Sequence, residues 1–274
     1  MKLTLLGTGS PIPSPDRAGS ANLIEAGPHR LLVDCGRGVV MRLAAAGALP
    51  GMLSHVFLTH LHSDHVTDFN DLITTRWAMS PVDNPLTVTG PPGTQRFTDR
   101  TLAMLEDDIG YRIAHHDDLN WQPGVNVDEV HDGVAWERDG VRVVAAPTDH
   151  RPVDPTVGYR FEHEGRSIVL AGDTIPCEGL DRLLANADVY VQTVIRPDLV
   201  AMVPSARFQD IHDYHSSCEQ AGATASKAGV GTLVLTHQVP TPMPGTEQEW
   251  IDQVRAGGFT GEVVFAHDLT VVEV

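Results

Sequence analysis

Several features that define common classes of protein are missing from this sequence. No apolar run approaches the ~20 residues that a bilayer-spanning helix needs. Only three cysteines occur, and no CxxC pair is among them, which excludes a disulfide scaffold and a cysteine-based zinc ribbon. Basic residues are also scarce, since 19 Lys and Arg face 36 Asp and Glu, a formal net charge of −17. A nucleic acid would therefore meet a repulsive average field.

The residues that are present describe an ordinary globular protein with an unusual supply of histidine. The chain has 274 residues, of which 42% are hydrophobic and 20% charged, so it can bury a sizeable core. We expect a single domain over residues 1–274. Gly7 and Gly9 interrupt the N-terminal apolar stretch too early for a secretory signal, so we expect a cytoplasmic protein without membrane contact. Fourteen histidines in an acidic chain direct attention to metal.

Hydrophobic patterning predicts short strands with helices between them. Most strand-like runs are rich in Val, Leu and Ile without strict alternation, which is typical of strands covered on both faces. We predict strands at Lys2–Leu6, Arg30–Val33, His55–Thr59, Pro85–Thr89, Val141–Ala146, Thr156–Phe161, Ser167–Ala171, Val189–Thr193, Thr232–Thr236, Glu262–Phe265 and Leu269–Val274. This pattern indicates a layered α/β protein, and its alternation is too uneven for a TIM barrel.

Three helices and three loops complete the expected organisation. Helices are predicted over Val66–Met79, which carries an apolar stripe, over Cys218–Ala228, followed by Gly229 as a C-cap, and from a capping box at Thr246-Glu247-Gln248-Glu249 to about Ala256. Segments 81–93, 111–136 and 195–214 carry Pro, Asp and His, and we expect loops there.

The strongest signal for chemistry is Thr59-His60-Leu61-His62-Ser63-Asp64-His65. It places four ligand-type side chains within six residues, between an apolar strand and an amphipathic helix. Imidazole nitrogen and carboxylate oxygen both suit Zn²⁺ and similar divalent ions. A solvated histidine-rich loop is the plain alternative, but this position in the chain favours a metal site.

Three further ligand-type residues follow predicted strands. His150 comes after Val141–Ala146, and Asp173 and His237 each follow a later apolar strand. Each alone would more often be a turn residue. In an α/β sheet, however, several strand ends can deliver side chains to one crevice, so we expect all three at the metal site.

With these residues the chain resembles the metallo-β-lactamase-fold hydrolases over essentially its whole length, and within them the ribonuclease Z and phosphodiesterase branch. The resemblance implies a four-layer αββα sandwich, a dinuclear metal site and a homodimer. The motifs that carry it, besides the histidine cluster, are Leu6-Gly7-Thr8-Gly9-Ser10, Val33-Asp34-Cys35-Gly36, Gly158-Tyr159-Arg160, Ala171-Gly172-Asp173-Thr174 and Asp213-Tyr214-His215-Ser216-Ser217. The last is similar to the His-Ser-Thr motif of that branch.

The resemblance also implies a role for each site residue. One metal would be held by His60, His62 and His150, the second by Asp64, His65 and His237, with Asp173 bridging both. We expect two Zn²⁺ ions, although Mn²⁺ or Fe²⁺ also suits these ligands. Two such ions share a hydroxide that attacks phosphorus, while His215 protonates the leaving group and Asp64 doubles as a proton acceptor. Asp34 and Asp149 are expected to orient ligating imidazoles.

Three departures from the branch bear on substrate. Its tRNA-processing members carry a long arm between the residues matching His150 and Asp173, whereas only 22 residues lie between them here and a plain hairpin around Glu164-Gly165 is predicted. The acid that partners the His-Ser-Thr histidine is absent from Val191-Gln192-Thr193-Val194. Gln238-Val239-Pro240 replaces a Ser-x-Arg-Tyr segment. We therefore expect a small phosphodiester as substrate and disfavour tRNA.

Other functions remain open at this point. The same site suits a sulfate ester or a lactone, because each accepts a metal-bound hydroxide. A non-catalytic metal-binding protein acting through partners is disfavoured by the complete ligand set. Arg151, Arg196 and Lys227 are candidate anion contacts, and His115-His116 lies in a predicted loop that could face substrate; none of these belongs to the expected site.

Overall fold

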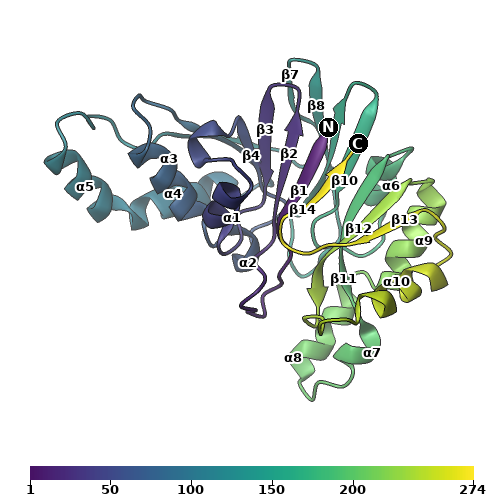
Figure 1. Ribbon diagram of the computed structural model, residues 1–274. Helices are drawn as coiled ribbons and strands as arrows, with labels where there is room; N and C mark the ends of the chain where they lie inside the picture. Colours follow the sequence, from purple (N-terminus) through teal and green to yellow (C-terminus); the bar gives the residue numbers. More distant parts are fainter.

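Two seven-stranded sheets pack face to face and carry helices on their outer sides (Figure 1). The computed structural model describes residues 1–274. Each sheet has an antiparallel half and a parallel half, and the two chain termini lie next to each other at β1 and β14. The expected four-layer αββα sandwich is confirmed. No helix is long and apolar enough to cross a membrane.

The first sheet has the order β14-β1-β2-β3-β4-β5-β6. Its strands are β1 (Lys2–Gly7), β2 (Ala21–Ala26), β3 (His29–Val33), β4 (His55–Phe57), β5 (Leu86–Gly90), β6 (Val125–Glu129) and β14 (Thr270–Glu273). The helices on its side are α1 (Val39–Ala45), η1 (Pro50–Met52), α2 (Ser63–Val66), α3 (Phe69–Ala78), α4 (Thr94–Met104) and α5 (Glu106–His115).

The second sheet has the order β13-β12-β11-β10-β9-β8-β7. Its strands are β7 (Gly133–Arg138), β8 (Val141–Pro147), β9 (Val157–His163), β10 (Arg166–Leu170), β11 (Val189–Ile195), β12 (Thr232–Val239) and β13 (Glu262–Phe265). Its helices are α6 (Glu178–Leu184), α7 (Pro197–Val200), α8 (Ala206–Gln209), η2 (Asp210–Asp213), α9 (Cys218–Ala228) and α10 (Glu247–Ala256).

Three buried apolar clusters hold the four layers together. The cluster between the sheets includes Leu5, Phe57 and Phe161. A second joins the second sheet to its helices, and a third joins the first sheet to α1 and α3. Most central strands are therefore buried on both faces, which is why they appear in the sequence as continuous apolar runs.

Several elements differ from the sequence-based expectation. The segment 111–136, expected as loop, contains the end of α5 and the strands β6 and β7. Both strands lie at sheet edges and are mostly exposed or half-buried, so they lack the apolar signature of a central strand. The segment 195–214 holds short helical turns. The sequence analysis also missed β2, α1, α4 and α6.

Helix boundaries differ from the sequence patterns in two places. The predicted helix Val66–Met79 is two helices, α2 and α3, so Asp64 and His65 of the metal motif lie on a helical turn of their own. The capping box expected at Thr246 is wrong, because that side chain caps no backbone N–H of α10. A capping box occurs instead at Ser217 and Gln220 of α9, and Gly229 ends that helix in the left-handed conformation as predicted.

Close packing of α9 against α10 gives a stability prediction. A Cβ on Gly222 would overlap the carbonyl oxygen of Val254, whereas a Cβ on the helical Gly110 would meet nothing. Gly222→Ala should lower the free energy of unfolding by about 1–3 kcal/mol through overpacking. Gly110→Ala should raise it by about 0.5–1 kcal/mol through helix propensity. Urea denaturation measures both, and a Gly222→Ala protein as stable as wild type would contradict the close approach.

Candidate metal centre

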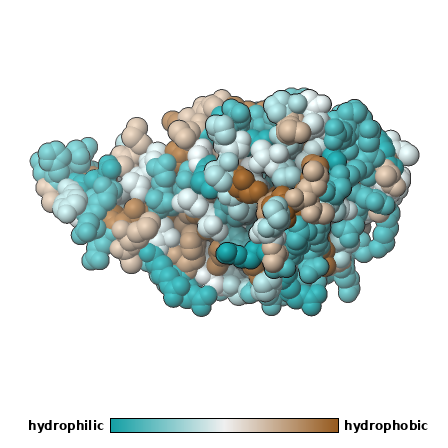
Figure 2. Space-filling view, turned by 90° about the horizontal axis from the view of Figure 1, so that it is seen from below, coloured by the Kyte–Doolittle hydropathy of each residue, from teal (hydrophilic) through white to brown (hydrophobic).

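Seven ligand-type side chains form a cluster. Two of them, Asp64 and His65, lie on α2, which is at one edge of the sandwich (Figure 1). The motif after β4 comes from the first sheet, and β8, β10 and β12 of the second sheet supply the others from their C-terminal ends. A hydrogen bond from Val157 N to Thr59 O (3.0 Å) ties the two sheets together here. Figure 2 looks onto this face, where apolar surface gathers near the middle and the two ends are mostly hydrophilic.

One group of side chains consists of His60, His62, His150 and Asp173, whose ligand atoms all lie within 4.8 Å of one another. Nε2 of His60 is 3.1 Å from Nδ1 of His62, which is 3.3 Å from Nε2 of His150. Asp173 Oδ2 lies 3.9 Å from both Nε2 atoms. The sequence spacing His-x-His thus places two imidazoles on one side of this group.

A second group consists of Asp64, His65 and His237, also within 4.8 Å of one another. His237 Nε2 is 3.0 Å from Asp64 Oδ2. Asp173 Oδ2 lies 3.5 Å from His65 Nε2 and 3.6 Å from His237 Nε2, so this one oxygen stands between the two groups. The seven residues expected from the sequence are therefore all brought together.

The chemistry of these atoms suits a bound cation. His65 Nε2 and Asp173 Oδ1 are buried and have no hydrogen-bond partner, although buried polar atoms normally find one. The carboxylates of Asp34, Asp64 and Asp173 are also buried. Burial of a carboxylate is costly without compensating positive charge. Nitrogen and oxygen donors of this kind match zinc and related divalent ions.

The electrostatics of the cluster keep the carboxylate charged and leave neutral imidazoles available. Burial alone would raise the pKa of Asp173, but the imidazoles of His237 and His65 hold that pKa well below its usual value. Burial and neighbouring histidines lower the pKa of His60 well below its usual value. Burial likewise lowers the pKa of His150 to about 4. Both rings are therefore neutral near pH 7 and offer a lone pair.

A second set of hydrogen bonds orients the imidazoles. Asp34 Oδ2 accepts from His65 Nδ1 (2.8 Å), and its carboxylate also accepts from Thr59 N and Oγ1. Thr59 Oγ1 in turn accepts from His60 Nδ1 (3.0 Å), and the Tyr214 carbonyl accepts from His150 Nδ1 (2.8 Å). In each case the bond to Nδ1 leaves Nε2 facing the cluster. Asp34 thus does what the sequence predicted.

Asp149, the other residue expected to orient an imidazole, does not do so. Its two oxygens accept from Arg151 Nε and Nη2 at 2.9 and 2.5 Å instead. The Thr59 hydroxyl and the Tyr214 carbonyl were missed by the sequence analysis. A backbone carbonyl leaves no signal in a sequence, and Thr59 was identified only as the start of the motif.

Comparison with known proteins identifies the family. The family model described as Beta-lactamase superfamily domain matches residues 29–238. The Ribonuclease Z of Mycobacterium avium (strain 104) is 55% identical and that of Mycobacterium bovis (strain BCG / Pasteur 1173P2) is 53% identical, each match covering 100% of this chain and 98% of the relative. The chain belongs to the ribonuclease Z family of the metallo-β-lactamase superfamily.

Solved structures show the same fold. The metallo-β-lactamase fold protein YhfI from Bacillus subtilis superposes with a TM-score of 0.75 at 20% identity and 99% coverage of both chains. Human tRNase Z, short form, gives a TM-score of 0.73 at 24% identity, covering 100% of this chain and 99% of that one. The expectations of this fold, of this family and of a metal-dependent hydrolase are therefore confirmed.

His215, the histidine of the motif that resembles His-Ser-Thr, lies against the cluster. Its Nε2 is 3.3 Å from Asp173 Oδ2, and its Nδ1 is 3.2 Å from the Ile211 carbonyl oxygen. Both neighbouring oxygens are hydrogen-bond acceptors. Gln192, at the place where an acid was expected, bonds to Tyr190 and Thr193 rather than to His215. The Ile211 carbonyl is instead the hydrogen-bond partner of His215 Nδ1.

The three cations expected as candidate anion contacts are each paired with a carboxylate. Arg151 binds Asp149 and Lys227 binds Asp181 at 2.6 Å, while Arg196 binds Asp198 at 2.6 Å. Between His150 and Asp173, β9 and β10 form a plain antiparallel hairpin, as the sequence predicted. No basic arm extends from this part of the protein.

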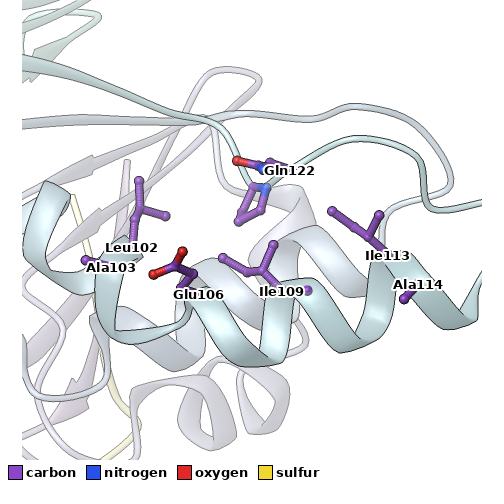
Figure 3. A pocket seen from close by; sticks show the side chains of 9 residues that line it. Leu102, Ala103, Glu106, Ile109, Ile113, Ala114 and Gln122 are labelled. Atoms are coloured by element: carbon purple, nitrogen blue, oxygen red, sulfur yellow. The ribbon is translucent and has the colours of Figure 1, made fainter.

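One groove lies away from the metal centre. It has a volume of about 590 Å³ and runs between α5 and the segment around Gln122, with Leu102, Ile109 and Ile113 facing it (Figure 3). Helix α5 projects from the body of the protein (Figure 1), so His115 at its end is remote from the cluster. A second groove of about 480 Å³ is lined by His215 and the start of α9 and borders the centre directly.

The hydrogen bonds of Asp34 give a prediction about metal affinity. Asp34→Asn removes the charge behind His65 and should weaken metal binding about 10–100-fold. Asp149→Asn, which breaks only the exposed pair with Arg151, should leave the affinity unchanged. Competition with a chromogenic chelator measures both, with circular dichroism as a check on folding. Equal affinities in the two variants would contradict the role of Asp34.

Proposed function

We propose that this chain hydrolyses phosphodiester bonds with two divalent metal ions. His60, His62 and His150 would hold one ion, and Asp64, His65 and His237 would hold the other, with Asp173 shared. The observation that carries this proposal is the convergence of both groups on Asp173 Oδ2, which lies 3.3–3.9 Å from five imidazole nitrogens. Zinc is the ion we propose, with Mn²⁺ and Fe²⁺ as alternatives.

The residues of the chain have distinct tasks in this reaction. When bound, the two ions would supply a nucleophile at neutral pH and stabilise charge on the phosphoryl oxygens. His215 would donate a proton to the leaving alkoxide, because it is the imidazole beside Asp173 that lies outside the proposed ligand set. The Ile211 carbonyl fixes its Nδ1–H and so directs Nε2 at the cluster. Burial would raise the pKa of Asp64, but His65 and His237 lower it, so that the group is ionised; we also propose that it doubles as a proton acceptor.

We propose a small phosphodiester as the substrate. The plain hairpin between His150 and Asp173, the net charge of −17 and the ion pairs of Arg151 and Arg196 all support this. RNA is the second candidate, and the observation that favours it is the name Ribonuclease Z of the relatives at 53–55% identity. Sulfate esters and lactones remain candidates for the same site.

Three further expectations belong to this proposal. We propose that residues 1–274 act as one domain, that the protein functions in the cytoplasm, and that it forms a homodimer. Size-exclusion chromatography with light scattering tests the last of these directly.

Metal removal tests the proposed centre. Purified protein should contain about two metal equivalents by elemental analysis, and chelation should abolish hydrolysis of bis(p-nitrophenyl) phosphate until Zn²⁺ is restored. Asp173→Ala should retain fewer than two equivalents, because both groups lose their common ligand. Two full equivalents in that variant would contradict the shared role.

The same assays test which bond is cleaved. If the wild-type protein binds two metals and hydrolyses an aryl sulfate or a lactone but no phosphodiester, the proposal moves to that bond.

Leaving-group dependence tests His215. General acid catalysis contributes about 10²–10⁴-fold, so His215→Ala should slow an alkyl phosphodiester by that order. A p-nitrophenyl ester, whose leaving group needs no proton, should be slowed much less. His116→Ala, an exposed histidine beyond α5, serves as the control. Equal loss on both substrates would contradict the assignment.

A further inference from the structure

The backbone at His237 adopts an unusual conformation. Its φ of 49° lies in the left-handed region, which costs a non-glycine residue of order 1–3 kcal/mol unless its surroundings impose it. The register between β11 and β12 shifts at this point, because Thr193 pairs with Thr236 and Ile195 with Val239. Two residues of β12 thus oppose one of β11, which is a β-bulge. Bulges beside active sites re-aim side chains.

The second residue of this bulge, Gln238, is locked by its side chain. It is 2% exposed. Its Nε2 donates to the carbonyls of Leu235 (2.9 Å) and Ala266 (3.2 Å), and its Oε1 accepts from Arg17 Nη1 (2.6 Å). All three hydrogen bonds hold the amide in one orientation. Two of them are made with backbone carbonyls, and the third is made with the side chain of Arg17.

Arg17 reaches this position from the long connection between β1 and β2. Its Nη1 also donates to Thr8 Oγ1 (2.8 Å), and its guanidinium lies 5.7 Å from the centre of the Phe265 ring. Asp268 fixes the same connection by accepting from Thr8 N (3.0 Å) and Ala18 N (2.7 Å). The guanidinium therefore joins a segment of the first sheet to the end of β12 in the second sheet.

We propose that Arg17, acting through Gln238, is a positioning residue for His237. The guanidinium holds the Gln238 amide, the amide holds the bulge, and the bulge places His237 Nε2 3.0 Å from Asp64 Oδ2. This inference rests on the proposed function, in which His237 is a metal ligand. Loss of Arg17 releases the strained backbone and lets His237 turn away from Asp64, while the group of His60, His62 and His150 is untouched.

The test compares two arginines of the same neighbourhood. Arg17→Met removes the donor to Gln238 and keeps much of the apolar stem. Arg42→Met is the matched control, because Arg42 binds Asp268 (Nε to Oδ2, 2.9 Å) and makes no hydrogen bond to Gln238. Metal stoichiometry, chelator competition and the visible spectrum of the Co²⁺-substituted protein are measured for both variants and for wild type.

Arg17→Met should bind one metal with wild-type affinity and the second about 10–100-fold more weakly, with an altered Co²⁺ spectrum. Arg42→Met should match wild type in all three readouts. Arg17→Lys, which keeps a single donor, should show a smaller loss, and it carries the test if Arg17→Met does not fold.

The possible outcomes distinguish failure of this inference from failure of the proposed function. The positioning role alone would be overturned if Arg17→Met bound two metals with wild-type affinities and spectrum. The same result in Arg17→Lys would overturn it where that variant carries the test. Equal weakening of both metals would also overturn it, since a general structural role predicts that result. Wild-type protein that binds no metal would overturn the proposed function and this inference with it.

Discussion

Burial of charge at one edge of the sandwich is the constraint on which this structure depends. Asp34, Asp64 and Asp173 are each less than 5% exposed, and a buried carboxylate is tolerated only when it is paired. The imidazoles of His237 and His65, which lower the pKa of Asp173, provide that pairing in part. The unpartnered atoms on His65 and Asp173 mark where a cation completes it. The donor set, the hydrogen bonds behind it and the shape of the surrounding loops all follow from this requirement.

The two sheets provide the rigidity that such a cluster needs. Apolar clusters on both faces of each sheet fix the strand ends, and three residues at or near strand ends beside the centre have an unusual backbone conformation. Asp34, Gly172 and His237 all have positive φ values, of 63°, 66° and 49°. A Cβ on Gly172 would lie 2.9 Å from Cβ of Thr59, so glycine is required beside Asp173. Two of the six non-glycine residues with positive φ, Asp34 and His237, therefore belong to the centre or support it.

The sequence was sufficient to predict the features that depend on local pattern. Buried strands form apolar runs, which predicted a layered α/β protein, and the cluster His60 to His65 lies in one short segment, which predicted a metal site. The αββα sandwich and the division of the ligands into two groups came from the family resemblance. Edge strands such as β6 lack that pattern and were missed. The acceptor for His215 is the Ile211 carbonyl, which no side chain signals. Arg17 and Gln238 are 221 positions apart, and nothing in either segment alone indicates that they meet.

The charge distribution limits how a substrate can be attracted. With a net charge of −17, the protein repels a polyanion at long range, and screening leaves only contacts within about 10 Å effective at ordinary ionic strength. Arg151, Arg196 and Lys227 are each neutralised by a carboxylate, so they add little attraction. The proposal of a small phosphodiester therefore assigns recognition of the phosphate mainly to the metal centre, which suits a substrate whose charge is concentrated at the scissile group. An extended RNA would need favourable contacts elsewhere to offset the repulsion along its backbone.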